Sequence, residues 1–251
     1  MIAAASCAAL LGLLVGSFLN VVAHRLPRRL SLVHPGSACP GCASPLRPLD
    51  NVPVLSWVAL RGRCRDCATR ISARYPLVEA GTAALMALVV AVHWGDPARL
   101  ALGLVLVAFL VPMALIDLDH RIIPNRLTGP AAVLAVLVGL ALDPAGAPER
   151  LVAGAGAFAL FLLAALARPG GMGMGDVKLA GVLGLFLGRT VLPALAVALL
   201  AGVLVGVAVL ARQGAVGRTT AVPFGPALAL GGVVALLAGE PLVEAYLGAL
   251  G

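Results

Sequence analysis

Residues 99–116 read RLALGLVLVAFLVPMALI, and Asp117 follows them directly. An apolar run of about 20 residues is long enough to cross the hydrocarbon core of a bilayer as a helix. Seven further runs of this kind occur, so the sequence predicts an all-α polytopic membrane protein with about eight transmembrane segments. The other runs lie at 2–23, 76–94, 127–142, 151–167, 177–188, 191–211 and 222–239.

The composition excludes a water-soluble enzyme. Of the 251 residues, 61% are hydrophobic and only 12% are charged, and the mean hydropathy is +1.05. A soluble domain usually carries about 25% charged residues. The net charge of +7 does not indicate a nucleic acid partner, because aromatic residues make up only 4% of the chain and form no stacking platform. The expected partner of most of the surface is the lipid bilayer.

The basic residues fall mainly into alternate loops. If the N-terminus lies outside the cell and the chain has eight spans, 15 of the 18 Lys and Arg residues lie in cytoplasmic loops. Only Arg99, Arg150 and Arg189 then lie outside. Because positive residues accumulate on the cytoplasmic side of membrane proteins, the charge pattern predicts a multi-pass protein with its N-terminus outside.

The same pattern predicts three parts of the chain. Residues 1–23 are expected to form the first transmembrane segment. Residues 24–75 contain no long apolar run and are rich in Pro, Arg and Cys, so we expect a cytoplasmic domain there. Residues 76–251 carry the remaining apolar runs and are expected to form the main membrane domain.

Two CxxC pairs lie in the predicted cytoplasmic domain, with 21 residues between Cys42 and Cys64. Each pair, Cys39-Pro-Gly-Cys42 and Cys64-Arg-Asp-Cys67, places two thiolates on one turn, and two turns supply the four sulfurs of a tetrahedral zinc site. Disulfides or a redox motif compete with this interpretation, but a reducing cytoplasm disfavours disulfides and no thioredoxin-like pattern surrounds the pairs. We therefore predict a zinc site that is structural, because four sulfurs leave no open position. Cys7, in the first span, is interpreted as a packing residue.

Acidic residues within a membrane are costly and require an explanation. Asp117 ends its apolar run, whereas Asp119 lies about 200° further round the helix and nearer water. Asp176 ends the glycine-rich stretch GGMGMGD at 170–176, at the start of the sixth run. The predicted topology brings Asp117 and Asp176 to the same cytoplasmic depth from different spans.

Three interpretations of these two acids remain open on the residues alone. Two carboxylates that share one proton activate water and protonate a leaving amine, as in aspartic proteases. The acids could instead line the pathway of a transporter, or be interfacial residues paired with Arg121 and Lys178. The glycines before Asp176 could simply allow close helix packing. Glu79, in the first turn of the second span, is interpreted as a partner of the helix dipole.

Several motifs resemble those of type IV prepilin peptidases. Gly173-Met-Gly-Asp176 is similar to the GxGD signature of intramembrane aspartic proteases, and DLDHRIIPN at 117–125 resembles the first aspartate motif of the prepilin peptidase family. Further similarities are GSFLNVV at 16–22, NVPVLSW at 51–57, ISARYPLVE at 71–79 and PFGP at 223–226. The similarity covers nearly the whole chain in the expected order.

This resemblance implies a bifunctional enzyme of the bacterial inner membrane with its active site near the cytoplasmic face. Such an enzyme removes the short basic leader of type IV prepilins or pseudopilins and N-methylates the new N-terminal residue with S-adenosylmethionine. The resemblance implies that Asp117 and Asp176 are the catalytic pair and that Cys39, Cys42, Cys64 and Cys67 bind zinc. Asp119 matches a motif position without being catalytic. Because no GxGxxG follows a strand, a cofactor site has to be built from the cytoplasmic loop and the span ends.

Overall fold

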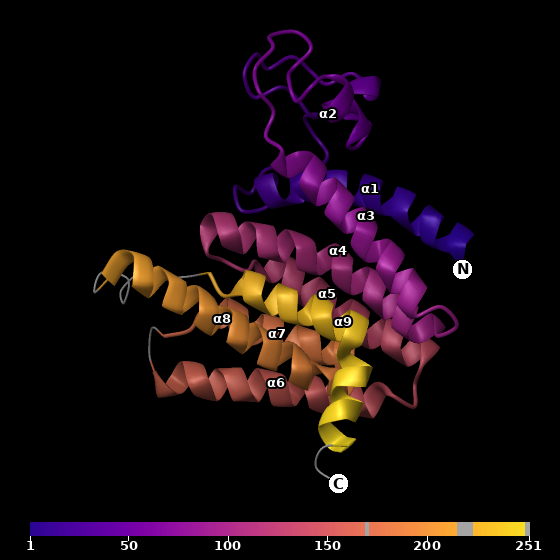
Figure 1. Cartoon of the computed structure of the whole chain (residues 1–251), viewed down its shortest axis with the longest axis vertical. Helices are drawn as coiled ribbons and strands as arrows, with labels where there is room; N and C mark the ends of the chain where they lie inside the picture. Colours follow the sequence, from indigo (N-terminus) through magenta and orange to yellow (C-terminus); the bar gives the residue numbers. More distant parts are fainter. Residues whose placement is uncertain (169–170, 215–222, 249–251) are drawn as a thin grey trace. The chain divides into compact units, whose positions relative to one another are not determined.

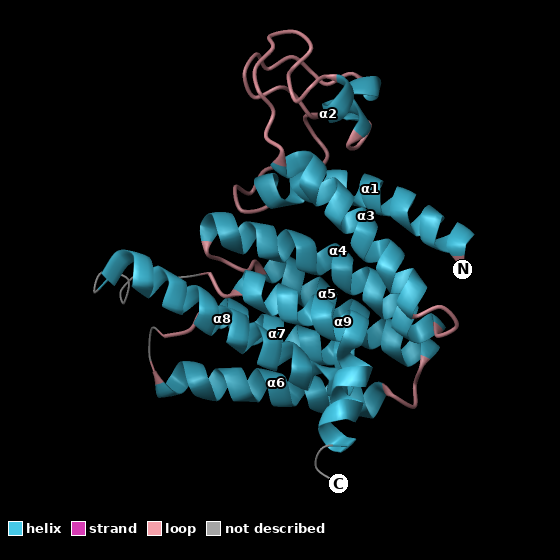
Figure 2. Cartoon of the chain, in the orientation of Figure 1, coloured by secondary structure: helices cyan, strands magenta, loops and turns pink. Residues whose placement is uncertain are grey.

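The computed structural model describes residues 1–168, 171–214 and 223–248, and within these ranges it contains helices but no β-strand (Figures 1 and 2). Two short 3-10 turns, η1 (Pro48–Asn51) and η2 (Gly188–Thr190), accompany the α-helices. The α-helices are α1 (Ile2–Arg25), α2 (Leu55–Ala59), α3 (Arg74–Val92), α4 (Pro97–His120), α5 (Asn125–Leu142), α6 (Ala147–Ala167), α7 (Met174–Leu187), α8 (Val191–Gln213) and α9 (Gly225–Gly248).

Each predicted apolar run coincides with one helix, α1 or one of α3 to α9. In the described residues, 7 stretches are long and apolar enough to cross a membrane, because α7 and α8 count together as the stretch Met174–Gln213. The all-α membrane fold class is therefore confirmed. Gly170 and the first residue of the run predicted at 222–239 lie outside the described ranges, and α9 continues well beyond residue 239.

The chain divides into two compact units, Met1–Ala91 and Val92–Gly251, which we call unit 1 and unit 2. Unit 1 contains α1, the cysteine-bearing segment and α3, whereas unit 2 contains α4 to α9. The three-part division at 1–23, 24–75 and 76–251 stays a prediction of the sequence.

In unit 1, α1 and α3 pack closely in opposite directions. A Cβ on Gly12 would lie 2.6 Å from the Cα of Ala83, and a Cβ on Gly16 would lie 2.8 Å from the Cα of Glu79. Only glycine permits this approach of two backbones. Near the same end, the side-chain amide of Asn20 donates a hydrogen bond to the Tyr75 carbonyl. The cysteine-bearing segment therefore begins and ends where the two helices are tied together.

The core of unit 2 surrounds α7. Val177, Ala180 and Leu183 of α7 are fully buried. Glycines allow α6 to approach α7 closely, since a Cβ on Gly184 would lie 2.5 Å from the Ala153 carbonyl oxygen. At 1.5 Å per residue, the 14 residues of α7 rise only about 21 Å, which is less than the hydrocarbon thickness of about 30 Å. The sixth apolar run, 177–188, holds only 12 residues in the sequence, and the helix that it forms is correspondingly short.

Ion pairs tie one end of unit 2 together. Arg99, at the start of α4, pairs with Glu240 of α9 at 3.1 Å, and Arg189 of η2 pairs with the same carboxylate. The Arg189 N–H also donates to Glu149, near the start of α6, at 2.7 Å. These contacts bring the starts of α4 and α6 to the region where α7 ends. The last part of α9 bends away from the bundle (Figure 1), as expected for a helix that contains Pro241.

Candidate functional site

Asp117 lies at the opposite end of unit 2, in the last turn of α4. Its side chain is buried, with 5% of the residue exposed, and its Oδ2 accepts a hydrogen bond of 2.8 Å from the Gly225 N–H. Gly225 is the first residue of α9, so this N–H is one of the donors that a helix leaves unpaired at its N-terminus. A Cβ on Gly225 would lie 2.7 Å from Oδ2, so the contact requires glycine. Arg121 then ends α4 in a left-handed conformation, with φ 55° and ψ 39°.

Asp176 lies in the first turn of α7 and is half-buried. Its carboxylate turns back toward the residue that precedes the helix, because a Cβ on Gly173 would lie 3.2 Å from Asp176 Oδ2. Gly175 packs against the segment that follows α4, where a Cβ would lie 2.9 Å from the Cβ of Ile123. Each glycine of the GxGD motif thus meets a specific neighbour. The start of α7 lies beside the chain that leaves Asp117.

Asp117, in the last turn of α4, and Asp176, in the first turn of α7, lie at the same end of unit 2. Among the described residues, neither carboxylate forms an ion pair, and Lys178 instead donates to the Asn125 side chain at 2.9 Å. The interpretation of both acids as ion-pair partners of Arg121 and Lys178 is therefore wrong. Two acids without a cation, at the meeting point of three helix ends, fit an acid pair that shares a proton.

The position of Asp117 and Asp176 argues against the interpretation of these acids as part of a transporter pathway. Transporters bind their substrates near the middle of the bilayer, often at broken helices. Asp117 lies in the last turn of α4 and Asp176 in the first turn of α7, so both acids lie at one end of the bundle.

Asp119 is exposed, as its predicted position nearer water requires. The sequence singled out Gly225 only as part of the PFGP motif, and it did not indicate a contact with Asp117.

In unit 1, the four cysteine side chains form one cluster. All four sulfurs lie within 4.8 Å of one another, with Cys39 and Cys67 at 3.7 Å and Cys42 and Cys64 at 4.0 Å. Four sulfurs at 2.3 Å from a zinc ion lie about 3.8 Å apart, whereas a disulfide brings two sulfurs to about 2.05 Å. The cysteines are unpaired and fit a tetrahedral metal such as zinc.

Two short turns of similar geometry carry these cysteines. An isolated antiparallel bridge joins Ala38 to Pro45 around the first pair, and a second joins Arg63 to Arg70 around the other pair. The turn around the second pair is braced by Arg65, whose guanidinium lies beside Asp50 and lowers the pKa of that carboxyl. The local fold therefore aims all four thiols at one point, as the CxxC spacing predicts.

Glu79 differs from its interpretation in the sequence. Helix α3 begins at Arg74, so Glu79 lies beyond the first turn and is not placed to interact with the helix dipole. Its side chain is buried, with 8% of the residue exposed, and Oε2 accepts a hydrogen bond of 2.7 Å from the Val54 N–H. The carboxylate therefore braces the segment between α1 and α3 rather than its own helix.

Comparison with known proteins covers most of the chain. The model of the bacterial peptidase A24 N-terminal domain matches residues 10–94, and the model of the type IV leader peptidase family matches residues 104–210. The chain is 39% identical to a prepilin leader peptidase/N-methyltransferase of Pseudomonas aeruginosa, over 96% of this chain and 92% of the relative. It is 38% identical to proteins of the same name from Aeromonas hydrophila (95% and 92%) and Pseudomonas putida (97% and 94%). No solved structure matches the chain.

Proposed function

Because this chain belongs to the type IV leader peptidase family, we propose that it removes the leader peptide of type IV prepilins or pseudopilins and N-methylates the new N-terminal residue. The observation that carries the proposal is the pair of acids Asp117 and Asp176. They come from two helices that meet at one end of unit 2, and neither forms an ion pair in the described part of the chain. The proposed enzyme is a membrane-embedded aspartic endopeptidase.

The proposed chemistry divides between the two carboxyl groups. One carboxylate accepts a proton from a water molecule, which attacks the carbonyl carbon of the scissile bond, and the other carboxyl donates a proton to the leaving amine. The Gly225 N–H holds Asp117 Oδ2, which leaves Oδ1 to act on the water molecule. The GxGD glycines let the start of α7 bring Asp176 close to the end of α4.

The charges at the two ends of unit 2 support a site near the cytoplasmic face. At the end opposite the acids, Arg99, Arg150 and Arg189 all pair with carboxylates, so these cations are neutralised. The end that carries Asp117 has excess basic residues, as expected for a cytoplasmic face. A leader that remains in the cytoplasm while the apolar helix of the prepilin lies in the bilayer presents its scissile bond at this depth.

The remaining cofactors have separate roles in the proposal. Cys39, Cys42, Cys64 and Cys67 would hold zinc and so fix the cytoplasmic turns, with no part in bond cleavage. S-adenosylmethionine, when bound, supplies the methyl group for the second reaction. We place the enzyme in the inner membrane of a bacterium, with its N-terminus outside.

The proposal is tested by incubating the purified protein with a prepilin and S-adenosylmethionine, then reading the new N-terminus by mass spectrometry. We expect loss of the leader and the added mass of one methyl group on the new N-terminal residue. Omission of S-adenosylmethionine should leave a cleaved but unmethylated product. An intact prepilin after incubation with well-folded protein would refute the peptidase function, and a product that is never methylated would refute the second activity.

A further inference from the structure

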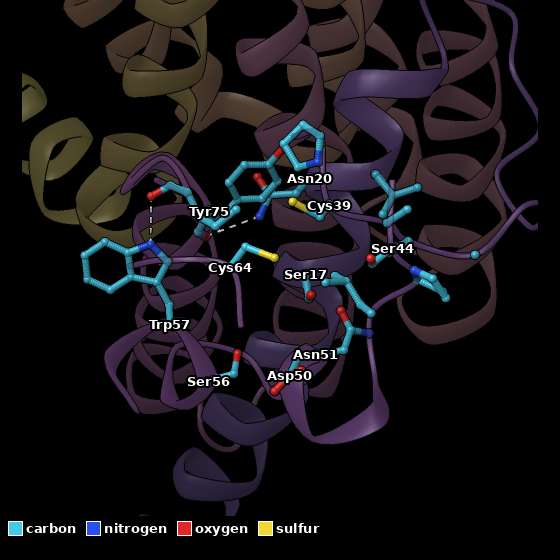
Figure 3. A pocket seen from close by; sticks show the side chains of 18 of the residues that line it. Ser17, Asn20, Cys39, Ser44, Asp50, Asn51, Ser56, Trp57, Cys64 and Tyr75 are labelled. Atoms are coloured by element: carbon cyan, nitrogen blue, oxygen red, sulfur yellow. Dashed lines mark hydrogen bonds between the residues drawn. The ribbon is translucent and has the colours of Figure 1, made fainter. Parts of the chain in front are cut away.

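Helix α2 separates a cavity of unit 1 from the outer surface. The cavity measures about 730 Å³ and is lined by residues of α1, the cysteine-bearing turns and the start of α3 (Figure 3). Ser56 and Trp57 of α2 also line it, as does Asp50 of η1. Leu55 and Val58, the α2 residues on either side of that pair, do not line the cavity. One face of α2 therefore closes the cavity, and another face points away from it.

The outward face of α2 carries exposed apolar side chains. Leu55 is 67% exposed and Val58 is 61% exposed, and Leu49 of the turn η1 is 79% exposed. Leu55 and Val58 lie three residues apart and so share one side of the helix, and η1 packs against α2. We call these three residues the apolar patch. Single exposed apolar residues are common on protein surfaces, but a group of them outside the membrane-crossing helices indicates a binding surface.

The patch does not turn inward, because α2 is held on its cavity side. The Trp57 Nε1–H donates a hydrogen bond to the Ile71 carbonyl at 3.1 Å (Figure 3), and a Cβ on Gly62 would lie 2.8 Å from the Trp57 ring. The Ile71 N–H in turn donates to the Gly62 carbonyl at 2.8 Å. These contacts fix which face of α2 lies against the cavity, so the apolar patch stays on the outer surface.

A contact with α3 sets the depth of the patch relative to a bilayer. The N–H of Val54, the residue immediately before α2, donates to the Glu79 carboxylate at 2.7 Å. Glu79 lies five residues beyond the start of α3, which is long and apolar enough to cross a membrane. The 19 residues of α3 rise about 28 Å, close to the hydrocarbon thickness of about 30 Å, so the whole helix is needed to cross it. The start of α2 therefore lies near the boundary between lipid and water.

The segment that carries the patch is basic. Residues 26–73, between α1 and α3, include seven arginines and two aspartates. A zinc ion held by four thiolates would add a charge of about −2, which leaves the segment positive. Arg61 lies just beyond the end of α2, is exposed, and forms no ion pair with a residue that the structure describes. Arginine beside an apolar face suits a bilayer surface with anionic headgroups.

A protein partner fits the patch less well than lipid does. Three side chains on one turn of helix and an adjoining 3-10 turn do not supply the roughly 800 Å² per partner that a standard protein interface buries. A bilayer does not require that area, because α1 and α3 already hold the segment at its surface and the contact is then intramolecular in effect. A protein docked on the patch would also compete with headgroups at the start of α3.

We propose that α2 and η1 form an interfacial anchor that binds the lipid surface. Leu49, Leu55 and Val58 insert at the boundary between headgroups and acyl chains, and Arg61 lies at the level of the phosphates, with a preference for anionic lipid. The contact holds the outer wall of the cavity and the cysteine-bearing turns in one orientation against the membrane. It requires only that α1 and α3 cross the bilayer, so it is independent of the proposed cleavage and methylation.

The test places the purified full-length chain in vesicles of phosphatidylcholine and phosphatidylglycerol that contain a phospholipid with a diazirine near the top of one acyl chain. After illumination, mass spectrometry of peptides should find label within residues 49–58 as well as in the membrane-crossing helices. Leu55→Glu combined with Val58→Glu should lower labelling of this stretch about tenfold, because a carboxylate is costly to bury in lipid. Val33→Glu, at an exposed position of the same segment outside α2 and η1, is the matched control and should leave this labelling unchanged.

Absence of label from residues 49–58 of the wild type, while α6 is labelled, would overturn the anchor, and so would equal labelling of this stretch in the double variant. A second measurement uses the wild type alone, so it does not depend on the folding of a variant. Trypsin should cut after Arg61 about fivefold more slowly in the mixed vesicles than in vesicles of phosphatidylcholine alone, because anionic headgroups hold the arginine at the surface. Equal rates of cutting would refute the contact of Arg61 with anionic lipid.

Discussion

The aspartate site of unit 2 and the cysteine-lined cavity of unit 1 are built in opposite ways. Asp117 and Asp176 lie at the ends of two packed helices, and their positions follow from helix packing and from glycines at the contacts. The cavity is formed largely by irregular backbone that holds its shape through the cysteine cluster, the Glu79–Val54 hydrogen bond and the pairing of Arg65 with Asp50. The first site needs little support beyond its scaffold, whereas the second depends on cross-links between loops.

The largest effect expected from this difference is a loss of cleavage without a loss of structure. Asp117→Asn or Asp176→Asn should reduce the rate of prepilin cleavage by about 1,000-fold or more, because members of a catalytic pair act as a unit. Zinc content should stay as in the wild type, since the cysteine cluster belongs to unit 1. Cleavage assays and metal analysis on the same preparations measure the two outcomes.

Asp119→Asn is the matched control for this prediction, because Asp119 lies two positions from Asp117 but is exposed. It should cleave at close to the wild-type rate. Full cleavage by either catalytic variant would show that the pair is assigned to the wrong residues. A loss of zinc in those variants would show that the two sites depend on each other.

The reverse experiment removes the cross-link of unit 1. Cys42→Ser combined with Cys67→Ser should lose about one equivalent of zinc, because two sulfurs do not complete a tetrahedral site. The segment that carries the cysteines should then become sensitive to limited proteolysis, while cleavage should fall less. Cys7→Ser, in α1, should retain the metal. Retention of one zinc per chain in the double variant would contradict the four-cysteine site.

A smaller effect is expected from the glycine that orients Asp117. Gly225→Ala places a Cβ about 2.7 Å from Asp117 Oδ2, so the carboxylate has to move. A displacement of about 1 Å at a reacting group can reduce the rate about 100-fold. Gly206→Ala in α8 is the control, because a Cβ there meets nothing within 4 Å. Equal rates for the two variants would show that the Gly225 contact does not position the acid.

The features that could be predicted from the sequence are those with local signals. Apolar runs of sufficient length located the helices, and the CxxC spacing located four sulfurs that the structure brings together. The two acids were conspicuous because each adjoins an apolar run. Motif order then connected the chain to a family, which the comparisons bear out.

The features that were missed depend on contacts between distant residues. Gly225 lies 108 positions from Asp117, so no local pattern links its N–H to that carboxylate. Glu79 was misinterpreted because the start of α3 lies earlier than the apolar run suggests, and because its partner Val54 belongs to another segment. A cavity assembled from loops has no periodicity, so its residues could not be identified before the loops were placed.

The smallest effect is expected at the end of unit 2 opposite the two acids, where ion pairs stabilise the fold and take no part in the proposed cleavage. In the turn between α5 and α6, Asp143 accepts from the Arg150 guanidinium at 2.8 Å and from the Gly146 N–H at 3.1 Å. These bonds lower the pKa of Asp143 below its usual value. A carboxyl whose folded pKa is lowered stabilises the fold above its unfolded pKa, about 3.9, and the contribution is lost as the pH falls through the lower folded value.

Asp143→Asn should therefore lower the melting temperature of the purified protein by only about 1–2 °C at pH 7, because a single ion pair with a solvent-accessible carboxylate contributes little. The difference from the wild type should shrink as the pH falls from about 4 through the lower folded pKa, because the carboxyl of the unfolded chain is protonated first and that of the folded protein last. Once both are protonated, the two side chains carry the same charge. Prepilin cleavage at neutral pH should stay unchanged, since the turn lies at the far end of the bundle from Asp117. Melting curves from pH 3 to pH 7 in detergent measure the first effect. A difference between the two proteins that is independent of pH would show that the Arg150 pair does not stabilise this end through charge, and a loss of cleavage would show that the two ends of unit 2 are coupled.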